Sequence, residues 1–326
     1  QYFSYGLSIE AKIRRLLGDS DQQAVPIALV GWPHTEQQKQ TTRAKLDKNT
    51  LRITAYGQSF KQHVLRELEP LMPRATFAFI GGPGAPLNFA FARYLEDQPT
   101  VQSDVAILGI VASSVPDIPT MTHMTRNFEM PFPHTYPLYV WNGSECDTVR
   151  PIVNSCQSLR ETLDDRTKRE AWLAQLREHD DYYSSLMFRE SVLDLSTCTR
   201  LLRRAWGHRV LRSRVEMTHS STGFVEDSQA ILSARWMVRQ FAERARNEGA
   251  LPVVLLFNSR DFADHLDRML CPTLEADGIP YLSTQQLAPS NDPRNFLRDG
   301  HFVHAANRKF ALALKTLIER ELADGA

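Results

Sequence analysis

A serine and an aspartate–histidine pair are the residues of this chain best suited to act together in a reaction. Ser59 follows an apolar run at residues 51–56 and precedes a helical pattern at residues 60–71. A serine hydroxyl at such a strand-to-helix turn is exposed, and its backbone N–H lies at a helix N-terminus, where it can stabilise a negative oxygen. Taken alone, a serine at this position is more typical of a helix N-cap.

Asp299 stands two residues before His301, just ahead of the last helical pattern. A carboxylate in that position can accept a hydrogen bond from the imidazole, which fixes the tautomer and supports the imidazolium that forms when the histidine takes a serine proton. Asp-Gly-His is also a common turn. His304 is the alternative to His301, and its spacing from Asp299 is less favourable.

Residues 81–84 read Gly-Gly-Pro-Gly and follow another apolar run. Glycine lets the backbone approach a ligand closely, so that its N–H can point at negative charge. An ordinary turn would have the same composition. The spacing of a dinucleotide-binding fingerprint is absent, so the loop does not predict a nucleotide site.

The segments that must position these residues alternate between strand-like and helical patterns. We predict strands at 51–56, 75–80, 105–111, 252–257 and 279–282, and helices at 60–71, 88–95, 227–247 and 303–322. Ahead of them lie a helical piece at 9–17, a short strand at 25–30 and a loop or exposed helix at 37–49. The alternation is typical of a parallel sheet covered by helices on both faces. Ligands bind outside the carboxyl ends of such strands, where Ser59 and the glycine loop would meet.

Two stretches interrupt this alternation. Residues 115–137 hold five prolines and several aromatic side chains, and predict a long functional loop. Residues 151–206 are charged and largely helical, and predict an insertion that acts as a lid or a partner surface. The expected organisation is therefore an N-terminal extension at 1–50 and a main domain at 51–326 that contains the loop and the insertion.

In chain order, these segments resemble the SGNH, or GDSL-like, hydrolase superfamily. Residues 53–60 resemble the nucleophile block, with Gly57-Gln58-Ser59 in place of the usual Gly-Asp-Ser, and residues 299–301 resemble the final block. Residues 80–85 resemble the block whose glycine donates an oxyanion N–H, which by position is Gly84. The resemblance implies a three-layer α/β/α sandwich with a flavodoxin-like parallel sheet. It also implies a Ser59–His301–Asp299 triad, an oxyanion hole that includes the Ser59 and Gly84 backbones, and no metal or organic cofactor.

One block departs from the family pattern. The family places an asparagine after the third strand, where this chain reads Gly-Ile-Val-Ala-Ser-Ser at residues 109–114. Ser113, Ser114 or Asn88 could supply the missing donor, or the hole has fewer donors. Losing one donor typically costs about 10²–10³ in rate. On the same rim, Asn258 and Arg260 follow the fourth strand and are candidates for substrate binding.

Three functions compete on this reading. The first is a serine esterase that cleaves small acyl esters, such as acetyl groups on carbohydrate. The second is an O-acetyltransferase that modifies an extracellular polysaccharide with a membrane-bound acyl donor protein as partner. The third is a non-catalytic binding or scaffold module with a degenerate site, for which residues 151–206 would form the contact surface.

The composition and the first residue limit the expected partners and the expected location of the protein. The 326 residues carry 38 basic and 38 acidic side chains, so no net charge favours nucleic acid as a partner. No apolar run approaches the roughly 18 residues of a transmembrane helix. The first residue is Gln rather than Met, which is typical of a mature or shortened chain. We therefore expect a periplasmic or extracytoplasmic location with a removed N-terminal signal or anchor, with the cytoplasm as the alternative.

Some polar residues have unremarkable interpretations. The four cysteines, Cys146, Cys156, Cys198 and Cys271, lack the spacing of a zinc site, and a Cys146–Cys156 bridge or free thiols both fit the sequence. The arginine-rich stretch 201–214 predicts a solvated helix face. Three further histidines are predicted to be polar surface residues: His63, His123 and His134.

Overall fold

The computed structural model describes residues 4–18, 31–32, 50–97 and 102–324, so the strand predicted at 25–30 and the segment predicted at 37–49 lie outside the described residues. The chain forms two compact units. We call residues 34–115 and 221–326 the sheet unit, and residues 1–33 and 116–220 the helical unit. The segments predicted as the loop 115–137 and the insertion 151–206 fall almost entirely in the helical unit, together with the first helix of the chain.

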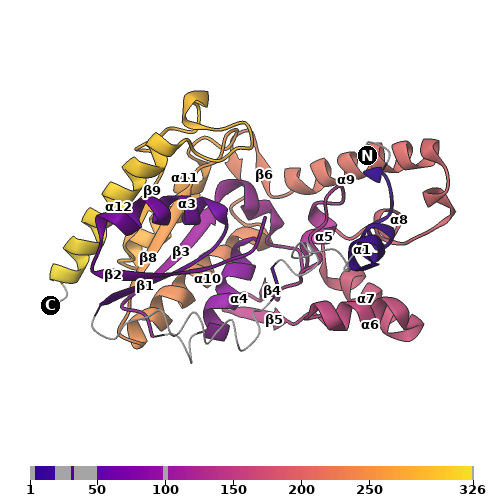
Figure 1. Ribbon diagram of the computed structural model, residues 1–326, viewed down its shortest axis with the longest axis horizontal. Helices are drawn as coiled ribbons and strands as arrows, with labels where there is room; N and C mark the ends of the chain where they lie inside the picture. The colour runs from indigo at the N-terminus through magenta and orange to yellow at the C-terminus, as the bar shows by residue number, and fades with distance from the viewer. Residues whose placement is uncertain (1–3, 19–30, 33–49, 98–101, 325–326) are drawn as a thin grey trace. The chain divides into compact units, whose positions relative to one another are not determined.

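The sheet unit is built on five parallel strands in the order β2-β1-β3-β8-β9 (Figure 1). The strands are β1 (Leu51–Tyr56), β2 (Ala75–Ile80), β3 (Val105–Val111), β8 (Leu251–Phe257) and β9 (Tyr281–Ser283). The first three have the bounds expected from their apolar runs, β8 begins one residue earlier, and β9 is shifted toward the C-terminus. The chain leaves β1 for β2 on one side and later enters β3 on the other, so the strand order reverses next to β1, where such sheets bind ligands.

Side chains on successive strand residues face opposite layers of helices. Ile53 and Ala55 of β1 belong to a core shared with α3 (Ser59–Leu68) and α12 (His304–Asp324). On the other face, the Tyr56 ring lies edge-on to the Tyr94 ring of α4 (Leu87–Asp97), which in turn contacts α10 (Gln229–Asn247) through Phe241. The predicted three-layer α/β/α sandwich with a flavodoxin-like sheet is therefore confirmed.

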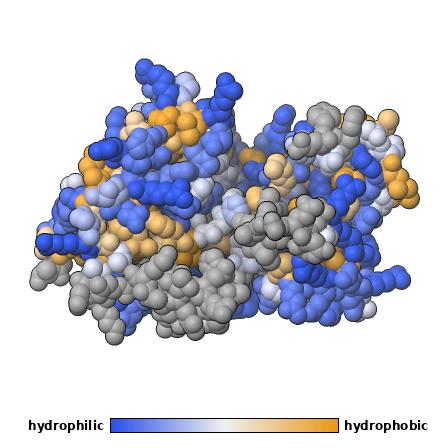
Figure 2. Space-filling view, in the orientation of Figure 1, coloured by the Kyte–Doolittle hydropathy of each residue, from blue (hydrophilic) through white to orange (hydrophobic). Residues whose placement is uncertain are grey.

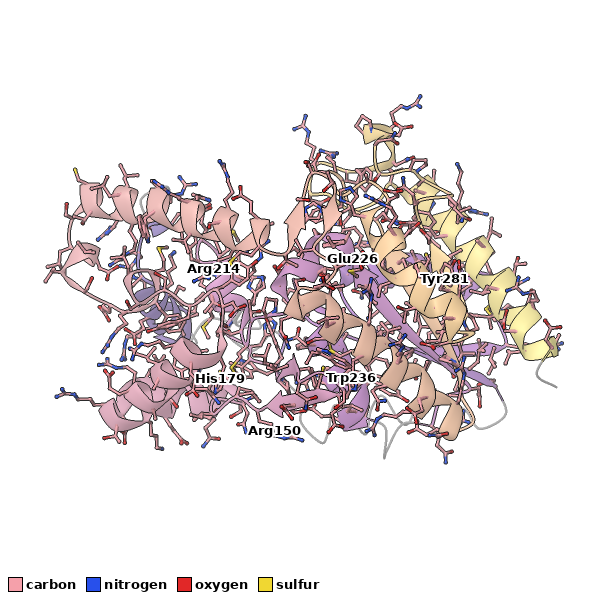
Figure 3. The ribbon with its side chains drawn as sticks, turned by 180° about the vertical axis from the view of Figure 1, so that it is seen from behind. Arg150, His179, Arg214, Glu226, Trp236 and Tyr281 are labelled. Atoms are coloured by element: carbon pink, nitrogen blue, oxygen red, sulfur yellow. The ribbon has the colours of Figure 1, made fainter. Side chains whose placement is uncertain are left out.

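The remaining elements of the sheet unit are short or peripheral. Helix α11 (His265–Ala276) packs against α10 and β8. Seen from behind, Trp236 marks α10 and Tyr281 marks β9 (Figure 3), and the Trp236 ring contacts Phe91 of α4. The short elements are η3 (Glu69–Leu71), η4 (Ala112–Asp117), which runs into the helical unit, β7 (Gly223–Phe224) and η6 (Pro293–Asn295).

The helical unit has its own hydrophobic core. Its helices are α1 (Ile9–Gly18), α5 (His123–Arg126), α6 (Cys156–Asp164), α7 (Arg166–His179), α8 (Ser185–Phe188), η5 (Val192–Asp194) and α9 (Thr197–Glu216). Strands β4 (Leu138–Trp141) and β5 (Cys146–Val149) pair as an antiparallel hairpin, and β6 (His219–Ser220) ends the unit. Trp172, Leu173 and Phe188 are fully buried in a core that includes side chains of α1, α5, α6, α7 and α8. Among the described residues, no helix combines the length and apolar content needed to span a bilayer.

Three predictions about polar residues need correction or completion. His123 and His134 are buried in the helical unit, so their assignment to the surface is wrong. Arg203 is also buried, although most of the arginine-rich stretch is exposed as predicted, because its guanidinium is paired with Asp194. All four cysteines are free.

Candidate active site

Ser59 is the first residue of α3 and lies at the carboxyl end of β1. Gln58 precedes it with an extended backbone and makes no capping bond through its side chain. The Ser59 hydroxyl oxygen lies 2.7 Å from Nε2 of His301, although 242 residues separate the two in sequence. The serine therefore contacts a histidine through its hydroxyl, which distinguishes it from a simple helix cap.

Three glycines let the strand ends approach one another around Ser59. Gly57 has a φ of +139°, and a Cβ at this position would lie 2.7 Å from the carbonyl oxygen of Gly109, in the second half of β3. A Cβ on Gly81, just after β2, would lie 1.9 Å from the carbonyl oxygen of Gly57. Because side chains at Gly57 or Gly81 would collide with backbone, glycine is required for this close junction of β1, β2 and β3.

The turn that carries His301 is held by its own backbone. The Leu297 N–H donates to the His301 carbonyl oxygen at 2.7 Å, and Phe296 and Phe302 form an antiparallel bridge. Gly300 has a φ of +90°, which glycine adopts easily and other residues rarely do. The turn therefore directs the His301 ring by main-chain hydrogen bonds and by one glycine.

Asp299 contacts His301 twice. One carboxylate oxygen accepts the backbone N–H of His301 at 3.1 Å, and the other lies 3.1 Å from Nδ1, in a direction that departs from a straight hydrogen bond. The backbone N–H and the imidazole together hold the pKa of the Asp299 carboxyl below its usual value. The Asp299 side chain is 64% exposed, so solvent screens its charge more than in a buried triad.

Two aromatic rings hold the imidazole in place. Phe60, the residue after Ser59, stacks on the His301 ring with centroids 4.7 Å apart. The His63 ring meets the same imidazole edge-on at 5.0 Å. Burial, helped by the nearby His301, lowers the pKa of His63, so this ring favours its neutral form. The rival His304 is occupied elsewhere, because its Nδ1 lies 2.8 Å from a carboxylate oxygen of Glu67 on α3.

Sequence reasoning overlooked Lys61, which lies in the same helical turn as Ser59. Its side chain is almost completely buried, and burial lowers its pKa to about 7. The ammonium nitrogen lies 3.3 Å from the point where a Gly81 Cβ would be, and the Lys61 Cβ packs where Gly109 lacks a side chain. Within the described part of the chain, this amine forms no hydrogen bond or ion pair. The only sequence signal was the placement of glycines directly after two strands, at Gly57 and Gly81, and within a third, at Gly109.

The predicted oxyanion donors differ in their exposure and in the hydrogen bonds that they already make. Gly84 has a φ of +59° and is exposed in the loop after β2, and the Ser59 N–H lies at the N-terminus of α3. Asn88 is fully buried in the first turn of α4. The Ser114 hydroxyl donates to the carbonyl oxygen of Val111 at 2.8 Å, so it is engaged with its own backbone. The Ser114 hydroxyl hydrogen is therefore not directed at a ligand in this structure, contrary to its predicted role as an oxyanion donor.

The two predicted substrate contacts have different surroundings. The Asn258 amide is buried and donates to Asp267 and Ser283, so it is tied into the interior. Arg260 is exposed, and its guanidinium lies 5.7 Å from the centroid of the Phe296 ring, at the base of the His301 turn. Of the two, only Arg260 is accessible to a bound molecule.

Two further serines, Ser113 and Ser259, hydrogen bond to each other at the same edge of the sheet. The Ser113 N–H donates to the Ser259 hydroxyl oxygen at 3.2 Å, which joins the ends of β3 and β8. The Ser259 hydroxyl in turn donates to the Ser113 hydroxyl oxygen at 3.2 Å. Among the described residues, no three His, Cys, Asp or Glu side chains are grouped as metal ligands would be.

Comparisons with known proteins find similarity only at the level of solved structures. No protein-family model matches the chain, and no curated protein matches it. One similar structure is a GDSL-like lipase from Bacteroides thetaiotaomicron, with 9% identity and a TM-score of 0.42 over 88% of this chain and 97% of the other. Another is a proposed acylhydrolase from Bacteroides fragilis, with 10% identity and a TM-score of 0.41 over 89% of this chain and 98% of the other.

Proposed function

We propose that this protein is a serine ester hydrolase in which Ser59 attacks the ester carbonyl. The observation that carries the proposal is the 2.7 Å contact between the Ser59 hydroxyl oxygen and Nε2 of His301, at the carboxyl end of the strand where the sheet order reverses. A hydroxyl within hydrogen-bond reach of a histidine can pass its proton to the ring as the oxygen attacks.

His301 acts as the base when its proton resides on Nδ1, which leaves Nε2 to accept from Ser59. Asp299 lies on the Nδ1 side of the ring and favours that tautomer and the imidazolium that follows. The imidazolium then gives its proton to the departing alcohol, which leaves an acyl group on Ser59. Water attacks the acyl-enzyme after losing a proton to His301, and the free acid and the Ser59 hydroxyl are regenerated.

The oxyanion of each tetrahedral intermediate requires donors that do not move during the reaction. We assign this role to the backbone N–H groups of Ser59 and Gly84. The Ser59 N–H is supported by the helix dipole of α3. We choose Gly84 because it lies in the exposed loop after β2, at the same edge of the sheet as Ser59.

Small acyl esters, with acetyl esters of carbohydrate first, are the substrate class we propose, and Arg260 is the side chain we expect to contact the alcohol portion. Transfer to a carbohydrate hydroxyl would use the same acyl-enzyme, with the acceptor in place of water. A location outside the cytoplasm and a membrane-bound acyl donor protein belong to that second proposal.

Labelling with a fluorophosphonate probe tests the nucleophile directly. We expect the wild-type protein to be labelled at Ser59, as mapped by peptide mass spectrometry, and the Ser59→Ala and His301→Ala variants to remain unlabelled. Ser103→Ala is the matched control and should be labelled like the wild type, because Ser103 precedes β3 at the amino end of the sheet and its hydroxyl donates to Thr54 instead of contacting a histidine.

Release of acetate from p-nitrophenyl acetate and from acetylated oligosaccharides then distinguishes the substrates. Faster acetyl transfer to an oligosaccharide than to water would favour the acyltransferase. If folded wild-type protein is neither labelled nor active, the site is a binding site only and the proposal is wrong.

A further inference from the structure

Helix α9 of the helical unit exposes much of its apolar surface. Of its twenty residues, only Arg203 and Gly207 are buried. Leu202 is 71% exposed and Trp206 is 49% exposed, and Leu201 is also exposed. A surface helix normally turns its apolar stripe toward the core and its polar residues toward water. In the first half of α9 this arrangement is reversed.

The buried residues explain why α9 cannot rotate to hide this surface. Gly207 lies against Phe128 and Met187, where an added Cβ would collide with both side chains. One turn earlier, Arg203 forms a buried ion pair with Asp194. Rotation of the helix would break the ion pair and separate the glycine contact, so the outward position of Leu202 and Trp206 is fixed by the packing behind them.

The exposed apolar surface extends beyond α9. We define the α8–α9 apolar surface by its six exposed side chains: Leu186, Val192, Leu195, Leu201, Leu202 and Trp206. Val192 and Leu195, on the segment that joins α8 to α9, are 77% and 82% exposed. These six are half of the large apolar side chains exposed in the described chain, and all of them come from residues 186–206. Hydrophobic surface is visible over this joining segment in Figure 2.

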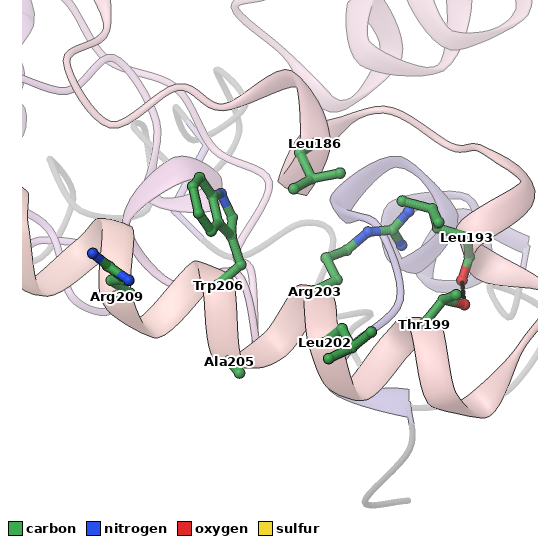
Figure 4. A pocket seen from close by; sticks show the side chains of 8 residues that line it. All are labelled: Leu186, Leu193, Thr199, Leu202, Arg203, Ala205, Trp206 and Arg209. Carbon is green, nitrogen blue, oxygen red and sulfur yellow. Dashed lines mark hydrogen bonds between the residues drawn. The ribbon is translucent and has the colours of Figure 1, made fainter.

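A pocket of about 460 Å³ opens within this surface. Leu186, Leu193, Leu202 and Trp206 line it, with Arg203 in its wall and Arg209 at one end (Figure 4). Leu186 comes from α8, whereas Leu202 and Trp206 come from α9. A hollow of this size and composition can accept a hydrocarbon segment while its arginine end stays in water.

The charge beside the apolar surface is strongly positive. Helix α9 carries six arginines and a single acidic residue, Glu216. Arg203 and Arg204 are neutralised within the unit by Asp194 and Glu129. Arg209 and Arg212 are exposed and form no ion pair with any described residue. The partner that covers this surface should therefore combine apolar groups with negative charge.

We propose that the α8–α9 apolar surface docks the protein onto a lipid bilayer that contains anionic phospholipids. Leucine, valine and tryptophan side chains enter the boundary between headgroups and acyl chains, and arginines bind the phosphates. A second copy of this chain fits the surface less well, because a symmetric contact would bring the unpaired arginines of both copies together. The proposal is independent of the chemistry assigned to Ser59.

Cosedimentation of the full chain with vesicles tests this docking. We expect binding to vesicles of phosphatidylglycerol and phosphatidylcholine, little binding to pure phosphatidylcholine, and weaker binding at high salt. The Leu202→Gln/Trp206→Gln variant should lower the partition coefficient about tenfold or more. Arg209→Gln and Arg212→Gln should each lower it about fivefold.

Matched controls separate docking from general effects of composition. Leu312→Gln changes an exposed leucine of the sheet unit, and Arg308→Gln/Lys309→Gln removes two exposed charges from α12. Both controls should bind the anionic vesicles as the wild type does. Circular dichroism spectra and thermal midpoints must show that every variant is folded.

Two results would overturn the proposal. One is a folded wild-type protein that does not bind anionic vesicles at low salt. The other is vesicle binding that the Leu202 and Trp206 substitutions leave unchanged. A concentration-dependent dimer that these substitutions abolish, without vesicle binding, would assign the surface to a second copy instead.

Discussion

The helical unit and the sheet unit both bury basic side chains, but they surround them differently. In the helical unit, Arg203 donates to Asp194 at 2.5 Å and to the Ser191 hydroxyl at 2.9 Å. Lys12 donates to the backbone carbonyl oxygens of Tyr5 and Phe128. In the sheet unit, Lys61 is equally buried and, among the described residues, has no such partner.

The two kinds of buried charge should therefore affect stability in opposite ways: the paired charge stabilises the fold, and the unpaired charge destabilises it. A buried ion pair with satisfied hydrogen bonds orders the segments that it joins, here the start of α9 and the turn at η5. An unpaired buried amine opposes folding whenever it is protonated. Lys61 lies in the same helical turn as Ser59, and groups with perturbed pKa values concentrate at functional sites. The comparison therefore predicts opposite responses to removing the two charges.

The largest change in stability is expected when the paired charge, Arg203, is removed. Arg203→Met leaves the Asp194 carboxylate buried without its cation, which should lower the free energy of unfolding by about 3–5 kcal/mol. The measurement is the thermal midpoint of the helical unit, which we expect to fall by roughly 10 °C. Arg212→Met, an exposed position on the same helix, is the control and should change stability by less than about 0.5 kcal/mol. Equal midpoints for the two variants would contradict a structural role for Arg203.

Removing the unpaired charge should have the opposite sign. Because burial lowers the pKa of Lys61 from 10.5 to about 7, the unfolded chain binds its proton more tightly than the folded one. The folded state is penalised fully below about pH 7 and regains stability as pH rises toward 10.5. Lys61→Met should thus stabilise the protein at pH 7 by a few kcal/mol, with about 5 kcal/mol as the ceiling.

Denaturant titrations of Lys61→Met and the wild type at pH 7 and pH 10 measure this gain. The gain should shrink at the higher pH, because above about pH 7 the folded wild type holds Lys61 as the neutral amine, and the cost of removing that proton falls as pH approaches 10.5. Lys309→Met, an exposed lysine of α12, should show no gain at either pH. A destabilised Lys61→Met variant at pH 7 would mean that the amine has a partner that stabilises its charged form.

A smaller effect is expected at the exposed acid of the site. Asp299 is 64% exposed, whereas the side chain of Asp194 is 9% exposed. Solvent weakens the contact between Asp299 and the His301 ring, so Asp299→Asn should slow fluorophosphonate labelling of Ser59 only about tenfold. A buried triad aspartate contributes about 10⁴ in rate. Asp292→Asn, in the loop before this turn, should leave the labelling rate unchanged. A loss near 10⁴ for Asp299→Asn would show that Asp299 is shielded from water during reaction.

Local apolar patterns were sufficient to predict the sheet, whereas the meeting of Ser59 and His301 was expected from the resemblance of their sequence blocks to the SGNH hydrolases. Apolar runs gave the bounds of β1, β2 and β3, and parallel strands place their carboxyl ends on one edge. The β4–β5 hairpin escaped prediction, since its two four-residue strands are too short to show a clear period.

Burial of individual charges could not be predicted in the same way. Arg203 resembles its exposed neighbours in sequence, and only the position of Asp194 and the contact at Gly207 turn it inward. Lys61 is polar and lies in a first helical turn, where exposure is the ordinary expectation. The space that its side chain occupies exists because glycines from three separate segments meet, and that meeting depends on the tertiary structure.

The smallest effect concerns Gly300, whose φ of +90° allows the turn that directs His301. Gly300→Ala should cost about 1–2 kcal/mol of stability, because a Cβ disfavours this conformation. It should also slow labelling of Ser59, since relaxing the turn moves the imidazole away from the hydroxyl. Gly249→Ala is the matched control: Gly249 has a φ of +77° and equally open surroundings, but it follows α10 on a different loop. Gly249→Ala should lose similar stability and keep the wild-type labelling rate. If both variants lose stability and neither labels more slowly, the position of His301 is fixed by Phe60 and His63 rather than by the turn.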